Sequence, residues 1–146
     1  MQQTDYARAE PGTELPPIAF GPITRQMLAL YAGASGDHNP VHIDIDFARQ
    51  AGLPDVFAHG MLSMGVLARV VTDWAGAGRL VTLSSRFLAI TPVGADLTCS
   101  GTVSEQFEQE GVPHLRIAIL AEITTPDGQN LKTLVGEAVV RAGDDP

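Results

Sequence analysis

The stretch HGMLSMGVLARVVTDWAG, residues 59–76, decides how this chain folds. Apolar side chains occupy most helical positions and leave no broad polar face. They are Met61, Leu62, Met64, Val66, Leu67, Val70, Val71 and Trp74. Because a helix without a polar face is usually buried on several sides, we expect residues 59–76 to form a central helix with the rest of the chain packed around it.

The chain after Gly78 is typical of β-strands, because it is rich in Val, Ile, Leu and Thr and is interrupted by turn signals. The Asp127-Gly128 pair marks one hairpin tip. The expected strands lie in residues 79–90, 95–108, 113–125 and 131–142. This pattern predicts consecutive antiparallel strands, a meander.

The beginning of the chain predicts one more strand and two helices. Prolines confine residues 11–23 to an extended lead-in or an edge strand. Thr24 can cap a helix that ends by Gly36, and Asp44 or Asp46 can cap a short second helix. An early strand, a long buried helix and a run of strands together predict an α+β fold, with a sheet wrapped around the helix.

The length indicates a single domain, and the charge bears on which partners it can bind. The 146 residues fit one domain over residues 1–146, of which we expect residues 1–12 to be flexible. The net charge is -8, from 17 acidic and 9 basic residues, and the basic residues are scattered. This charge pattern argues against a nucleic acid as partner.

The only cysteine, Cys99, excludes an internal disulfide, which suits a reducing compartment. Cys99 lies in an expected strand without an evident base, so we interpret it as a buried side chain and not as a nucleophile. The polar N-terminus lacks a signal-peptide core, and no apolar stretch is long enough for a bilayer. These features predict a soluble, cytoplasmic protein.

A second stretch, YAGASGDHNPVHID, concentrates polar and titratable groups in residues 31–44, which cannot be a regular helix or strand. Pro40 stiffens this segment, and Asn39 can hydrogen-bond backbone groups and hold a turn. A turned loop can bring Asp37 and His42 together. A carboxylate and an imidazole at one point form a general acid/base pair that can hold a water and deprotonate it.

The AHGM sequence, residues 58–61, begins the expected central helix. The N–H groups of a first helical turn lack internal partners and, with the positive end of the helix dipole, can stabilise an oxyanion. An acid/base pair beside such a turn suits chemistry next to a carbonyl. The carbonyl becomes enolate-like while a proton moves at the adjacent carbon.

ASGDHNPVHID followed by AHGMLSMG resembles the hydratase 2 motif of MaoC-like (R)-specific enoyl-thioester hydratases and dehydratases. The resemblance covers most of the chain and implies the hot-dog fold, an antiparallel sheet wrapped around a long helix. It implies a hydro-lyase that reversibly adds water to a trans-2-enoyl thioester, giving an (R)-3-hydroxyacyl thioester. No metal or redox cofactor is implied, and coenzyme A or an acyl-carrier protein is part of the substrate.

The resemblance also implies residue roles. Asp37 and His42 are the catalytic pair, with His42 as base toward the water and Asp37 as proton donor to C2, although coupled groups can exchange these roles. The family's loop-ordering Asn falls on Asn39, and its oxyanion donor falls on the backbone N–H of Gly60.

Four residues near the helix start are candidates for the substrate pocket: His59, Met61, Ser63 and Gly65. Some relatives carry a Ser where this chain has Gly65, with Ser63 nearby, so the contribution of a serine stays open. We favour a structural role for His59, which can cap the helix or orient the loop. We expect His38 and His114 to be exposed.

Several alternatives remain. The chain could be the catalytic subunit of a heteromeric hydratase for bulky or long acyl-CoA, a hot-dog acyl thioesterase, or a non-catalytic acyl-thioester-binding subunit. Asp37, His38, His42, Asp44 and Asp46 are close in sequence, but no cysteine cluster or helical spacing supports a metal site. A sheet around one helix leaves an edge and an apolar face uncovered, which predicts a homodimer or heterodimer.

Overall fold

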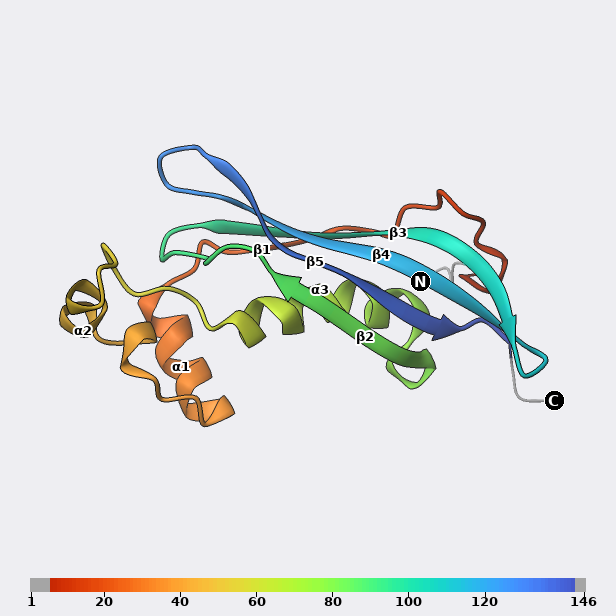
Figure 1. Cartoon of the computed structure of the whole chain (residues 1–146), viewed down its shortest axis with the longest axis horizontal. Coiled ribbons are helices and arrows are strands. Elements are labelled where there is room, and N and C mark those ends of the chain that lie inside the picture. The colour runs from red at the N-terminus through yellow and green to blue at the C-terminus, as the bar shows by residue number, and fades with distance from the viewer. Residues whose placement is uncertain (1–5, 144–146) are drawn as a thin grey trace.

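A computed structural model describes residues 6–143 of the chain. The strands are β1 (Ile18–Phe20), β2 (Leu80–Phe87), β3 (Asp96–Gln109), β4 (Val112–Thr124) and β5 (Asn130–Arg141). The helices are α1 (Arg25–Ser35), α2 (Ile45–Gln50) and α3 (Gly60–Ala75), and the 3-10 turns are η1 (Tyr6–Arg8), η2 (Pro40–His42) and η3 (Ala77–Arg79). The predicted α+β fold is confirmed: one antiparallel sheet curves around α3, which is the hot-dog arrangement (Figure 1).

The sheet has the order β1-β3-β4-β5-β2, with all neighbours antiparallel. The prediction of a meander is therefore right for β3, β4 and β5 and wrong for β2. The chain enters β2 from α3, which lies across the face of the sheet, and β2 pairs with β5 at the edge far from β1. Sequence order does not reveal this crossing. The predicted edge position of the early strand, β1, is confirmed.

The helix caps follow the predicted pattern. The Thr24 hydroxyl accepts from the N–H of Met27, and Gly36 ends α1 in the left-handed region with φ of 77°. Asp44 caps α2 by accepting from the N–H groups of Asp46 and Phe47. Residues 1–5 of the segment expected to be flexible lie outside the described residues, whereas the Gly12 N–H donates to the carbonyl of Val103 at 2.8 Å.

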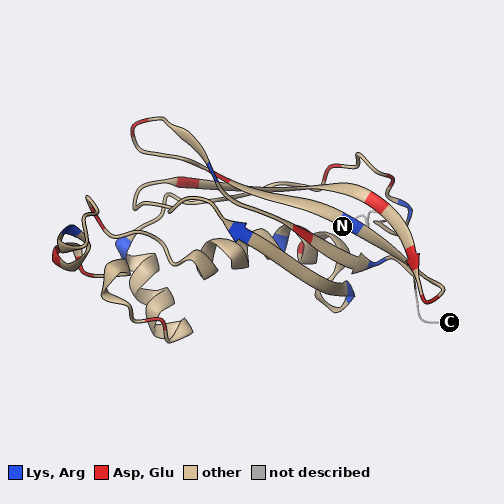
Figure 2. Ribbon diagram, in the orientation of Figure 1, with Lys and Arg blue, Asp and Glu red and all other residues tan. Residues whose placement is uncertain are grey.

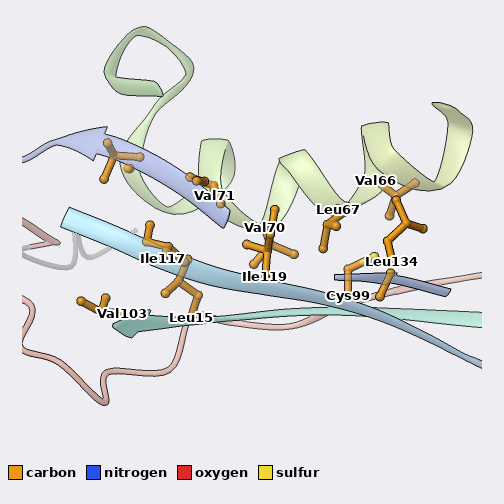
Figure 3. Packing of buried hydrophobic residues seen from close by; sticks show 14 of the residues in the cluster. Leu15, Val66, Leu67, Val70, Val71, Cys99, Val103, Ile117, Ile119 and Leu134 are labelled. Carbon is orange, nitrogen blue, oxygen red and sulfur yellow. The ribbon is translucent and has the colours of Figure 1, made fainter. Parts of the chain in front are cut away.

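The core lies between one side of α3 and the inner face of the sheet. Figure 3 shows Val66, Leu67, Val70 and Val71 of α3 facing strand residues such as Ile119. The opposite side of α3 is open, and the side chain of Met61 is 58% exposed. The expectation that α3 is buried on several sides is therefore wrong for this chain, because the sheet covers the helix from one side.

His114 was expected to be exposed, but it is only 6% exposed. It pairs across the strands with Phe107, and the two rings stack with their centroids 5.5 Å apart. Its Nδ1–H donates to the carbonyl of Val112 at 2.8 Å. The cross-strand aromatic neighbour provides the burial, and this neighbour becomes known only when the strand register is known.

The basic residues are scattered over the structure, as they are along the sequence. Figure 2 shows the Lys and Arg residues of the described part spread over several elements and not gathered along one of them. No helix among residues 6–143 combines the length and the hydropathy that crossing a membrane requires.

Two glycines offer a matched test of the packing. A Cβ on Gly136 would overlap the backbone of Ser84 on the neighbouring strand and lie 2.8 Å from the Cα of Ser85, whereas a Cβ on Gly65 would meet nothing within 4 Å. We expect Gly136→Ala to lower the free energy of unfolding by about 1–3 kcal/mol. Gly65→Ala should raise it by about 0.5–1 kcal/mol, because alanine favours a helix interior. Urea unfolding measures both, and equal effects of the two substitutions would contradict the close approach of β2 to β5.

Cys99 gives a second test of the core. Its side chain is fully buried in β3, and burial raises the pKa of its thiol to about 12. Because the thiolate is the reactive form, the folded protein should resist thiol reagents at mildly alkaline pH and react only after unfolding. Labelling of the native protein at the rate of a free thiol would show that this part of the core opens.

Candidate active site

The segment between α1 and α2 is a sequence of short turns. The N–H of Asp37 donates to the Ser35 hydroxyl at 3.2 Å, and the N–H of Asn39 donates to Oδ1 of Asp37 at 3.2 Å. Oδ1 of Asn39 in turn accepts from the N–H of Val41 at 3.1 Å, which begins η2 at Pro40. Such side-chain-to-backbone bonds fix a loop without regular structure.

His42 is buried, and its ring is held by Phe57. Nδ1 of His42 lies 2.8 Å from the carbonyl oxygen of Phe57, and the two rings meet edge to face with centroids 4.8 Å apart. Because a carbonyl can only accept, Nδ1 carries the proton, and in the neutral ring Nε2 keeps its lone pair. Nε2 lies 4.0 Å from Oδ2 of Asp37, whose side chain is half exposed. The structure therefore brings the two predicted catalytic side chains together.

His59 lies directly behind this pair and is 1% exposed. Its ring stacks on that of His42 with centroids 4.0 Å apart and an angle of 29° between planes. Its Nε2–H donates to the backbone carbonyl of Asp37 at 3.1 Å. Burial, and next the neighbouring His42, lower the pKa of His59, while the bond to Asp37 opposes this shift. The side chain makes no capping bond to α3, so it contacts the loop and does not cap the helix.

The amino end of α3 borders a cavity of about 370 Å³. The Leu62 N–H donates to the carbonyl of His59. The N–H groups of Gly60 and Met61 precede this bond and therefore have no acceptor within the helix. The cavity is mostly apolar, and Phe57 connects it to His42. Its lining residues are Phe57, Ala58, Gly60, Ser63, Phe87, Leu88, Ala89, Ile90, Thr91 and Leu134.

The structure separates the four pocket candidates. Ser63 is buried and lines the cavity, and His59 lies beside the predicted catalytic pair. Met61 and Gly65 do not line the cavity, because both lie on the exposed side of α3. Their place in a substrate pocket therefore stays a prediction.

Two aromatic residues that sequence reasoning missed belong to the site. Phe57 fixes the tautomer of His42, and Phe87 covers Gly60 so closely that a Cβ on Gly60 would lie 2.8 Å from the ring. Neither residue lies in a polar motif, and both reach the site by contacts that depend on the fold. No local signal could have identified them.

An ion pair joins the start of α1 to the segment before α3. Arg25, the first residue of α1, donates to both carboxylate oxygens of Asp55 at 2.8 and 2.5 Å, which ties α1 to the segment before α3. The hydrogen bonds from Arg25 hold the pKa of the Asp55 carboxyl below its usual range. His38 is exposed, as expected.

Among residues 6–143, Asp37, His42 and His59 form a group with metal-ligating atoms, which all lie within 4.8 Å of one another. It differs from the cluster considered in the sequence, because Asp44 is engaged as the cap of α2. The imidazole lone pairs lie in the ring planes, and stacked rings direct them alongside each other. This geometry suits an acid/base pair with a supporting ring better than shared coordination of one ion.

The chain is similar to several known proteins. The chain is 35% identical over 116 residues to the fatty acid synthase subunit beta of Aspergillus oryzae, covering 77% of the chain and 5% of that protein. It is 36% identical over 84 residues to the (R)-specific enoyl-CoA hydratase of Rhodospirillum rubrum, covering 56% of the chain and 58% of the relative. The chain thus spans a small part of the first and somewhat over half of the second.

Among solved structures, the unliganded R-hydratase PhaJ1 of Pseudomonas aeruginosa superposes with a TM-score of 0.77 at 27% identity. The alignment covers 96% of this chain and 86% of that one. The family model described as MaoC like domain matches residues 7–116. Because this match includes most of the chain, the protein belongs to the family of MaoC-like domains.

Proposed function

We propose that the protein is a hydro-lyase that reversibly adds water to trans-2-enoyl thioesters and forms (R)-3-hydroxyacyl thioesters. The observation that carries this proposal is the free Nε2 of His42, which lies 4.0 Å from Oδ2 of Asp37. His42 contacts Phe57, and Phe57 lines an apolar cavity at the amino end of α3. The relatives named as hydratases and the family membership support the same class of reaction.

The spacing of the pair suits a shared water. A distance of 4.0 Å is too long for a direct hydrogen bond and close to the roughly 4.5 Å that separates two polar atoms bridged by one water. Nε2 of His42 would take a proton from this water as its oxygen bonds to C3. The Phe57 carbonyl, which accepts from Nδ1, then stabilises the resulting imidazolium.

Asp37, as the proton donor, would then deliver a proton to C2. The electron pair of the alkene first moves toward the thioester carbonyl, whose oxygen becomes enolate-like, and then forms the new C2–H bond. Transfer of the proton from His42 to Asp37 restores the starting state. The N–H of Gly60 is the proposed donor to the carbonyl oxygen, because it precedes the helical ladder and borders the cavity.

The acid/base pair and the oxyanion donor would each contribute part of the rate enhancement. General acid/base catalysis typically contributes about 10²–10⁴-fold, and one oxyanion donor is worth on the order of 10²–10³-fold. The apolar cavity would bury the acyl group, and the thiol part, coenzyme A or an acyl-carrier protein, would remain outside it. These steps need neither a metal ion nor a redox cofactor.

The assembly proposed for this hydratase is a dimer. The strand β2 forms an edge of the sheet, and Met61 and Gly65 lie on the open side of α3. Pairing with another hot-dog chain would cover the strand edge and the helix side together. The partner is a second copy or a related subunit, and this chain, with both Asp37 and His42, would be the catalytic member.

Removal of either catalytic group tests the mechanism. We expect Asp37→Asn and His42→Ala each to lower kcat for a crotonyl thioester by at least about 10²-fold, because both groups act on one water. The double variant should lose little more than the worse single variant, since groups that act as a unit are not additive. Loss of absorbance of the conjugated alkene measures the rate.

His38→Ala is the matched control, because His38 is an exposed histidine in the same loop. It should keep the wild-type rate. A near-normal rate for either catalytic variant would refute the assignment. Release of free thiol without loss of the alkene would instead identify a thioesterase.

Sedimentation tests the assembly. We expect a dimer for the purified chain or for its mixture with a related subunit, and Met61→Glu should weaken it, because a charge would be buried in the contact. Leu131→Glu changes another exposed apolar residue, which lies in β5, and should leave the dimer intact. A stable monomer under all these conditions would overturn the proposal.

A further inference from the structure

We infer that His59 is a positioning residue that holds Asp37 and His42 in their working geometry through its Nε2–H group and its ring face. This inference rests on the proposed function, because it assigns a role within that site. It concerns a residue that would touch neither the water nor the acyl group directly.

The first contact fixes the position of Asp37. The other hydrogen bonds described for Asp37 join it to Ser35 and Asn39, which lie two residues away and leave the turn free to move as a unit. The bond from His59 Nε2–H to the Asp37 carbonyl crosses 22 residues of sequence. It ties the turn to the start of α3. The position of the half-exposed Asp37 side chain is thereby fixed relative to the amino end of the helix.

The second contact fixes the plane of His42. Phe57 meets the ring of His42 at its edge with an interplanar angle of 76° and accepts from Nδ1, whereas His59 covers a face of the ring at a centroid distance of 4.0 Å. Tyr31 of α1 packs against His59 with a centroid distance of 4.7 Å. His59 is therefore held between α1 and His42, and movement of its ring would displace the catalytic base.

The chemistry of His59 supports a role beyond filling space. Its Nδ1 is buried and has no hydrogen-bond partner among the described residues. An unpartnered buried polar atom costs free energy, and an apolar ring of similar size would avoid this cost. The cost is understandable if Nε2–H is needed as a donor, because a neutral imidazole with a proton on Nε2 leaves Nδ1 as an acceptor.

A neutral His59 also serves the proton transfer. The titratable groups that face it are Asp37, His42 and Tyr31. Burial lowers its pKa, so the ring stays neutral at neutral pH. A positive charge stacked on His42 would oppose the imidazolium that forms when His42 takes a proton from water.

Two amide substitutions provide a matched test. In His59→Gln the amide nitrogen reaches the place of Nε2 and can still donate to Asp37, whereas in His59→Asn it reaches only the place of Nδ1. We expect His59→Asn to lower kcat on the order of 10²-fold with KM nearly unchanged, because misplacement of a catalytic group by about 1 Å has such an effect. His59→Gln should recover most of this loss. Equal rates for the two variants, or a loss confined to KM, would overturn the inference.

A measurement without substrate separates this inference from the proposed function. Nitrogen-15 NMR of the histidines in the wild-type protein should show His59 as a neutral ring with its proton on Nε2 at neutral pH. A cationic ring, or a proton on Nδ1, would overturn the positioning role even if the variants fail to fold. Absence of hydration by the wild-type protein on a panel of enoyl thioesters, with His59 found neutral and Nε2-protonated, would refute the function alone.

Discussion

The packing of α3 against the inner face of the sheet is the constraint on which the site depends. The helix buries one side in the core, and this fixes where its amino end lies. The segment before the helix then carries Phe57 and His59 to the loop between α1 and α2. The geometry of the candidate site thus follows from a hydrophobic contact along the helix, and hydrogen bonds at the end of the helix orient the polar groups.

The hydrogen bond between His42 and the Phe57 carbonyl selects the tautomer of His42. An imidazole alone can carry its proton on either nitrogen, and the carbonyl selects Nδ1. The free nitrogen then faces a carboxylate that remains open to solvent and therefore to substrate. In the proposed mechanism, a backbone group outside the recognisable motif thereby decides which nitrogen of His42 can accept a proton.

Local rules predicted much of this molecule, whereas long-range contacts account for the rest. The caps at Thr24 and Gly36, the strands and the meeting of Asp37 with His42 follow from turn chemistry, periodicity and a family resemblance. The edge position of β2, the burial of His114 and the stack of His59 on His42 depend on how elements far apart in sequence pack. The open side of α3 was missed because an apolar residue at a surface looks the same in sequence as one in a core.

The candidate site and the turn between β3 and β4 lie toward opposite ends of the long axis of the molecule. The helices α1 and α2 lie at one end, and the turn between β3 and β4 lies at the other (Figure 1). This turn contains Glu110, whose φ is 53°, and Gly111, whose φ is 79°. A fluorophore, a surface tether or a fused carrier attached at this turn would lie at the end of the molecule opposite Asp37 and His42. The protein could therefore be immobilised through this turn with the candidate site facing the solution.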